Sequence, residues 1–148
     1  MVWGRIGVVL ATLVATAGLP VQNTQCAGTS RSIPIAVLPL NHQASVYNAA
    51  KAARVIHTQL TAVICENPRV LLLAEAAAER RDRGQARILI VGDLFWHQDQ
   101  SAVFLRSVNA QTGVVFYSAR QPIITDRPGL TILARRYVDS TVARFAGQ

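Results

Sequence analysis

The stretch RILIVGDLFW, from Arg87 to Trp96, is the longest apolar segment of strand type in the chain. Its β-branched and aromatic residues favour a buried strand, and Gly92 within it predicts a bulge or a close approach of neighbouring atoms. Two further strands are predicted at Ser101–Ala110 and Val114–Arg120. The residues between them, Gln111-Thr112-Gly113, are typical of a tight turn. This half of the chain therefore predicts a long strand followed by a β-hairpin.

Strands and helices alternate in the residues that precede this stretch. Ser32–Leu40 (SIPIAVLPL) predicts a central strand, and Ala44–Glu66 carries apolar residues at helical spacing. Arg69–Ala74 predicts a second short buried strand. Glu75–Arg83 is rich in alanine and charge, so it predicts a short exposed helix that ends at Gly84.

The last predicted element is a helix over Gly129–Ala146, with an i,i+4 ion pair expected between Arg135 and Asp139 on its outer face. The predicted order is therefore β-α-β-α-β-β-β-α. This order indicates the α/β (α+β) class, as a single mixed sheet of about five strands with helices packed on it.

Composition limits the classes of protein that these 148 residues can form. Hydrophobic residues make up 51% and charged residues 16%, which is enough apolar surface for one buried core. Two cysteines are too few for a disulfide scaffold or a cysteine-rich zinc site. No uninterrupted apolar run reaches the ~20 residues of a membrane-spanning helix. A multidomain enzyme, a polytopic membrane protein and a solenoid are excluded.

The first residues, 1–17, are typical of a secretory signal peptide. Arg5 precedes the apolar run Ile6–Val14, and Ala15-Thr16-Ala17 offers a small-x-small cleavage site. The alternative is a buried first strand or helix of a cytosolic protein. Cleavage would leave a small, polar, flexible lead-in at 18–32 and a single domain at 33–146. Lipid anchoring at Cys26 is not expected, because the preceding Asn-Thr-Gln is no lipobox.

Several blocks of the sequence resemble the group of TolB amino-terminal-domain-like proteins, which includes CsgG, FlgO and LpoB of the bacterial envelope. Ile35–Leu40 (IAVLPL) resembles the opening strand of the group, and the helix around Leu60 lies where its long first helix lies. Ile88–Gly92 (ILIVG) resembles its ILVG strand, and Val108–Val115 (VNAQTGVV) resembles its VDAETGEVV hairpin. The resemblance implies a stand-alone envelope domain that brings no catalytic residues with it.

The two cysteines are expected to meet. A helix of ~21 residues is ~31 Å long and a strand of ~8 residues is ~26 Å long, so a helix that returns along its strand places Cys65 near the start of that strand. Cys26 lies six residues before Ser32, within reach of the same point. Export to an oxidising compartment would favour the bond. The alternative is two unrelated thiols, with Cys65 a small core residue.

The sequence carries no motif for catalysis, for a cofactor or for a metal ion. The histidines His42, His57 and His97 lack metal-ligand spacing. His42 follows the carboxyl end of the first strand, where ligands bind in open α/β sheets, but a solvated loop histidine is the plainer interpretation. Asp93 and Asp99 could in principle form the carboxylate pair of a small hydrolase.

Basic residues dominate the charge, since 14 of the 15 are arginine and the net charge is +7. Guanidinium groups clamp phosphate or carboxylate in a bidentate way, although a merely solvated basic surface is the alternative. The candidate interaction surface comprises Arg80, Arg81, Arg83, Arg87, Trp96, His97, Arg135, Arg136 and Arg144.

These observations predict an exported, periplasmic or secreted, non-enzymatic domain that makes protein–protein contacts in envelope assembly or maintenance. The alternative is a binding module for an anionic envelope component, such as a lipid head group, lipopolysaccharide or a cell-wall polymer, through the arginine clusters. An exported protein would not be expected to bind nucleic acid.

Overall fold

The computed structural model describes residues 26, 32–43, 47–73, 85–97, 100–123 and 126–148. The predicted signal peptide at 1–17, most of the lead-in at 18–32 and the predicted helix at 75–83 lie outside the described residues, as do Arg80, Arg81 and Arg83.

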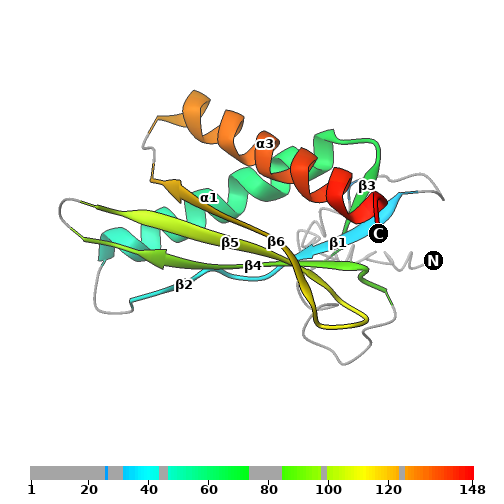
Figure 1. Ribbon diagram of the computed structural model, residues 1–148. Helices are drawn as coiled ribbons and strands as arrows, with labels where there is room; N and C mark the ends of the chain where they lie inside the picture. The colour runs from blue at the N-terminus through cyan, green and yellow to red at the C-terminus, as the bar shows by residue number, and fades with distance from the viewer. Residues whose placement is uncertain (1–25, 27–31, 44–46, 74–84, 98–99, 124–125) are drawn as a thin grey trace, which may run out of the picture.

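The described residues form one mixed sheet with helices on it, which confirms the predicted class (Figure 1). Strands follow the order β3-β1-β4-β5-β6, and β2 also pairs with β4. β1 is parallel to β3 and β4, whereas β4, β5 and β6 are antiparallel in turn. The sheet has six strands rather than about five, because a two-residue strand, β2, was not predicted. The elements are β1 (Ile33–Val37), β2 (Asn41–His42), α1 (Tyr47–Glu66), β3 (Val70–Leu73), β4 (Ile88–Phe95), β5 (Ala102–Asn109), β6 (Val115–Pro122) and α3 (Arg127–Ala146).

The two described helices, α1 and α3, lie on the same face of the sheet and run in the same direction (Figure 1). Their polar contacts advance together along the two helices: the Thr131 hydroxyl donates to Gln59 Oε1 at 3.0 Å, and Arg135 donates to Glu66 Oε2 at 2.7 Å. The predicted pair between Arg135 and Asp139 is wrong, because Asp139 instead accepts a hydrogen bond from Asn67 Nδ2 at 3.3 Å. Arg135 and Asp139 therefore bond to residues at the end of α1 and just after it, and not to each other.

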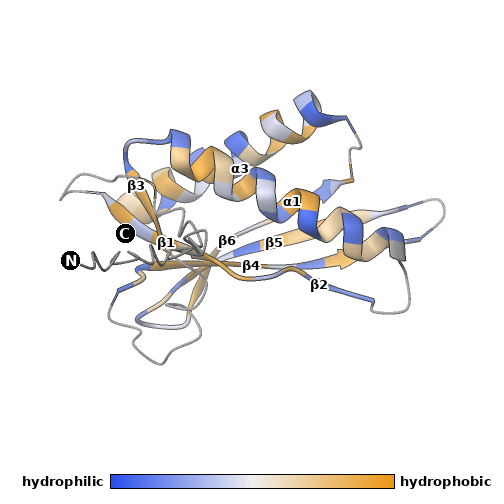
Figure 2. Cartoon of the chain, turned by 180° about the vertical axis from the view of Figure 1, so that it is seen from behind, coloured by the Kyte–Doolittle hydropathy of each residue, from blue (hydrophilic) through white to orange (hydrophobic). Residues whose placement is uncertain are grey.

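The core lies between the helices and the sheet and follows the predicted helical stripe. Hydrophobic and hydrophilic residues alternate along both helices in Figure 2, as amphipathic helices require. The buried residues of α1 are Ala49, Ala53, Ile56, Leu60, Val63 and Ile64, and those of α3 are Leu130, Ala134, Tyr137, Val138, Thr141 and Val142.

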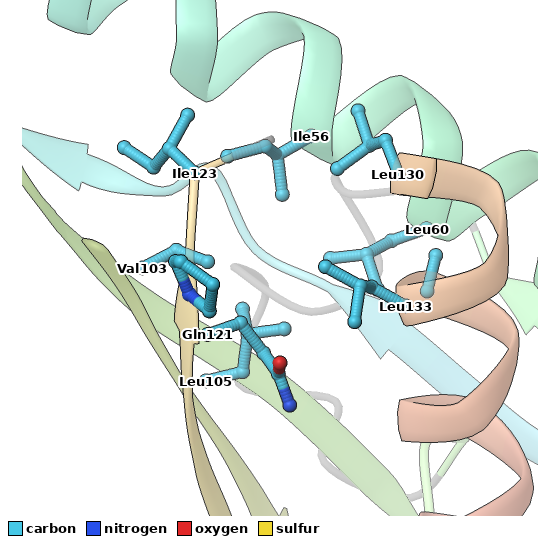
Figure 3. A pocket seen from close by; sticks show the side chains of 10 residues that line it. Ile56, Leu60, Val103, Leu105, Gln121, Ile123, Leu130 and Leu133 are labelled. Carbon is cyan, nitrogen blue, oxygen red and sulfur yellow. The ribbon is translucent and has the colours of Figure 1, made fainter. Parts of the chain in front are cut away.

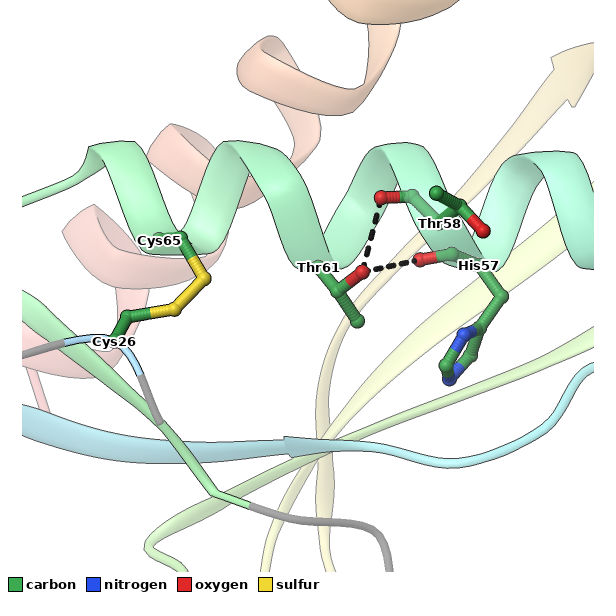
Figure 4. Close-up of a disulfide and its surroundings, with 5 residues drawn as sticks. All are labelled: Cys26, His57, Thr58, Thr61 and Cys65. Atoms are coloured by element: carbon green, nitrogen blue, oxygen red, sulfur yellow. Dashed lines mark hydrogen bonds between the residues drawn. A yellow bond between two sulfur atoms is a disulfide. The ribbon is translucent and has the colours of Figure 1, made fainter. Parts of the chain in front are cut away.

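The predicted disulfide between Cys26 and Cys65 is present (Figure 4). Their Cα atoms are 5.2 Å apart, within the range of natural disulfides. Both residues pack against the core near the carboxyl end of α1. The bond ties the segment before β1 to α1, and closing a loop of this length stabilises the fold by about 4 kcal/mol in the loop-entropy model.

Gly92 lies where β1 is interrupted before β2. Val37 pairs with Ile90 and Asn41 pairs with Asp93, so the β1–β2 side uses one residue more than β4 over the same span. A Cβ atom at Gly92 would lie 2.6 Å from Leu40 Cδ2 and 3.0 Å from the carbonyl oxygen of Phe104. The close approach predicted from the sequence is therefore confirmed, because Leu40 fills the space that a side chain would need.

Replacing Gly92 by alanine is expected to lower the free energy of unfolding by about 1–3 kcal/mol, the usual cost of overpacking a core. Gly147→Ala is the control, because a Cβ at Gly147 would meet its nearest atoms at an ordinary 3.7 Å. Urea denaturation of both variants measures the difference. Equal stability of the two variants would contradict the role given to Gly92.

The hydroxyl groups of Ser107, Tyr137 and Thr141 form a buried polar cluster between β5 and α3. Ser107 Oγ lies 2.7 Å from Tyr137 Oη and 2.8 Å from Thr141 Oγ1. All three residues are buried. Burial raises the pKa of Tyr137 to about 12, although its hydrogen bonds with Ser107 and Thr141 oppose the shift.

The raised pKa of Tyr137 predicts a loss of stability in alkali. Above its ordinary pKa of 10.0, the phenol ionises in the unfolded chain, while in the folded chain it keeps its proton up to about pH 12. The free energy of unfolding should therefore fall between pH 10 and 12 by up to about 3 kcal/mol. Denaturant titrations of Tyr137→Phe should lack this component of the pH dependence. Identical slopes for the variant and the parent protein would contradict the assignment.

Candidate functional site: an apolar groove at the carboxyl edge of the sheet

An apolar groove of about 270 Å³ opens at the edge where β4 and β6 end and both helices begin. One wall is the first half of α1, and the opposite wall combines the residues that follow β4 and β6 with the first turn of α3. The lining residues are Asn48, Lys51, Ala52, Val55, Ile56, Trp96, Ile123 and Leu130.

A smaller apolar cavity of about 20 Å³ lies beside the groove, between the sheet and the helices (Figure 3). Ile56, Ile123 and Leu130 line both spaces. The cavity has room for about one water molecule, but apolar cavities of this kind stay dry. These three side chains thus form part of the wall of both spaces.

The backbone around the groove is held by local hydrogen bonds. Ser101 Oγ donates to the His97 carbonyl at 2.8 Å and accepts from the His97 amide at 3.3 Å, which fixes the chain next to Trp96. The Ile123 amide donates to the Ser101 carbonyl at 3.1 Å. Asp126 caps α3, because its Oδ2 accepts from the Gly129 amide at 2.8 Å. These hydrogen bonds thus position the groove residues of three segments.

The chemistry of the groove suits the binding of apolar side chains. Val55 is 41% exposed, and Trp96 and Ile123 are half-buried against the core. Among the described residues that line the groove, Lys51 is the one with an ionisable side chain. A groove of this size is at the lower limit of pockets for small organic ligands, which are roughly 300–1,000 Å³. It fits a few side chains of another polypeptide.

Of the residues predicted from the sequence as an interaction surface, Trp96 lines the groove and His97 is exposed beside it. Arg87 lies at the opposite end of β4, and its guanidinium carbon is 5.1 Å from the ring centre of Phe145. The predicted surface is thus split between the two ends of the molecule.

The predicted arginines of α3 are likewise absent from the groove lining. The guanidinium of Arg144 lies 4.8 Å from the ring centre of Tyr117, and Arg135 is paired with Glu66. Arg136 is exposed. Of the four described arginines in the candidate surface, Arg87, Arg135 and Arg144 therefore make contacts within the chain.

Sequence analysis did not identify Val55, Ile123 or Leu130 as site residues. Only Val55 could have been noticed in the sequence, because it is an apolar residue outside the apolar stripe of its helix. Ile123 follows β6 and Leu130 lies in the first turn of α3, and only the folded chain brings them to the same edge as Val55.

The carboxylate of Asp93 is engaged elsewhere. It accepts from Asn41 Nδ2 at 3.0 Å and is paired with Arg106. Within the described ranges, no group of three or more His, Cys, Asp or Glu side chains could hold a metal ion. Neither described helix combines the length and hydropathy needed to cross a membrane.

No protein-family model matches this chain, and no curated protein matches it in sequence. Among solved structures, TolB from Acinetobacter baumannii is similar with a TM-score of 0.58 and 10% identity, over 83% of this chain and 30% of that chain. A DUF330 protein from Xanthomonas campestris is similar with a TM-score of 0.53 and 9% identity, over 79% of this chain and 90% of that chain.

The PelC dodecamer from Paraburkholderia phytofirmans matches with a TM-score of 0.47 and 18% identity, over 76% of this chain and 87% of that chain. The likeness to TolB and to the DUF330 protein shows a shared fold. The predicted resemblance is therefore confirmed for TolB, as a resemblance in fold.

The groove should bind a neutral apolar probe such as N-phenyl-1-naphthylamine, whose fluorescence rises in apolar surroundings. Val55→Arg is expected to weaken this binding about tenfold, because it removes an apolar contact of about 1.5 kcal/mol. Ile132→Arg is the matched control, since Ile132 is 53% exposed on α3 and is not part of the lining. Equal weakening by both substitutions would place the probe elsewhere.

Proposed function

We propose that this protein is an exported, non-enzymatic domain of the cell envelope that contacts a partner protein through the groove. The observation that carries the proposal is the groove itself, which is open, apolar and prearranged at the carboxyl edge of the sheet. A partner that inserts apolar side chains would cover Val55 and Trp96 and so remove exposed apolar surface from water.

The wall of the groove supports binding rather than catalysis. General acid–base and nucleophilic catalysis need at least one reactive group with a partner that activates it. Among its described lining residues, the groove offers only the amine of Lys51, beside the amide of Asn48. These polar groups suit the rim of an interface, where they would orient a partner.

Export is supported by three features. The order of charge, apolar run and small residues in 1–17 is that of a signal peptide. The disulfide between Cys26 and Cys65 suits an oxidising compartment. The resemblance in sequence to the TolB group implies the bacterial envelope, and the shared fold with TolB agrees with it.

Photo-cross-linking in the organism that makes the protein tests this function. A photoreactive phenylalanine at position Val55 should give discrete cross-linked species with one envelope protein, because Val55 lies in the groove. The same residue at Ile132, exposed outside the groove, should not. Equal cross-linking at both positions, or none at Val55, would reject the groove as the contact site.

The intact mass of the protein in cell fractions tests the compartment in the same cells. We expect the mass of residues 18–148 in the envelope fraction, two hydrogens lighter before reduction than after it. A full-length, reduced species in the cytosol would reject export, whatever the cross-linking shows.

A further inference from the structure

A second recess, of about 320 Å³, lies on the other side of α1 from the groove, against the chain between β1 and β2. The apolar part of its wall is Pro39, Leu40 and Ala53. The polar part differs from that of the groove, because it contains three basic side chains and a hydroxyl. These are His42, Arg54, His57 and Thr58.

The basic side chains of the recess come from two elements, α1 and β2. Arg54, His57 and Thr58 are spaced i, i+3 and i+4 on α1, so they lie on one side of that helix. The His57 ring extends from α1 toward β1 (Figure 4), and its Nε2 lies 3.4 Å from the Val37 carbonyl oxygen. When Nε2 carries the proton, it donates a hydrogen bond to that carbonyl oxygen.

His42 reaches the recess because the side chains of a strand alternate between faces. Asn41, the residue before it, bonds Asp93 at 3.0 Å. Since Asn41 and His42 point to opposite faces, Asp93 is directed away from the recess. No acidic side chain is among the described residues that line it.

We propose that this recess is a binding site for a phosphate group. Arg54 presents a planar fork of N–H donors that matches two phosphate oxygens. One ring nitrogen of each imidazole lies 3.4 Å from a carbonyl oxygen, that of Gln43 for His42 and that of Val37 for His57. The single N–H of a neutral imidazole would serve that carbonyl, so each ring donates to a phosphate through the second N–H that the imidazolium form carries, together with its positive charge. The recess has space beyond one phosphate, so a phosphate ester fits as well as the free ion. This site is separate from the groove, and it does not depend on the proposed partner protein.

Titration of the intact, disulfide-bonded protein with inorganic phosphate, followed by amide chemical shifts, tests the site. Saturable changes should be confined to the residues around His42, Arg54 and His57. Arg54→Gln should weaken binding about tenfold or more, because it removes a charge-assisted contact. Arg136→Gln removes the same charge from an exposed position of α3 and should leave the affinity unchanged. Equal weakening by the two variants, or the absence of saturation, would overturn the proposal.

The double variant His42→Gln/His57→Gln tests the imidazoles separately from Arg54. It should bind phosphate more weakly than the parent protein, and Arg54→Gln should weaken binding further in this background. Unchanged affinity in the double variant would overturn the role of the imidazoles.

Vesicles identify the source of the phosphate group. Sedimentation with phosphatidylglycerol vesicles, compared with phosphatidylcholine vesicles, should depend on Arg54 but not on Arg136 if the natural ligand is a lipid head group. Saturable binding of free phosphate without such sedimentation would identify a soluble phosphate compound instead. Both outcomes require the recess, and the Val55 variants of the groove should alter neither.

Discussion

The direction of the strands is the constraint on which the rest of this structure depends. β1 and β4 are parallel, and β6 regains their direction because two antiparallel pairings, β4–β5 and β5–β6, separate it from β4. A helix that follows such a strand returns antiparallel to it, and α1 and α3, which lie on the same face, therefore run in the same direction. Their first turns therefore meet the ends of β4 and β6 at one edge, where the groove lies.

The interruption between β1 and β2 has a similar consequence on the other side of α1. The extra residue on this side brings Leu40 over Gly92, and β2 then resumes pairing with β4. A regular strand would keep Pro39 and Leu40 within the ladder. The interruption instead makes Pro39, Leu40 and His42 part of one recess with α1. Gly92 is thus a packing requirement that also shapes a candidate binding site.

The opposite face of the sheet has a different chemistry. Asp93 pairs with Arg106, the ring centres of Phe95 and Phe104 are 5.3 Å apart, and the Arg120 guanidinium lies 5.4 Å from the ring centre of Phe104. Arginine side chains cover aromatic surface in this way and keep their charge in water. Some of the arginines that the composition suggests for ligand binding are therefore engaged in ion pairs and cation–π contacts within the chain.

The sequence by itself determined the features that depend on local periodicity and on turn chemistry. The buried stripe of α1, the hairpin at Gly113 with its φ of +74°, and the glycine within β4 were all predictable from residue type and spacing. The disulfide was predictable as well, because the lengths of one strand and one helix bring Cys65 back to Cys26.

Only the tertiary structure decided which residues from distant parts of the sequence become neighbours. Arg135 binds Glu66 rather than Asp139, and Val55 shares a groove with Ile123. Arg54 shares a recess with His42. These pairs depend on strand order and on one extra residue between β1 and β2. Hydrophobic periodicity reports which face of an element is buried, but it carries no information about the neighbour that buries it.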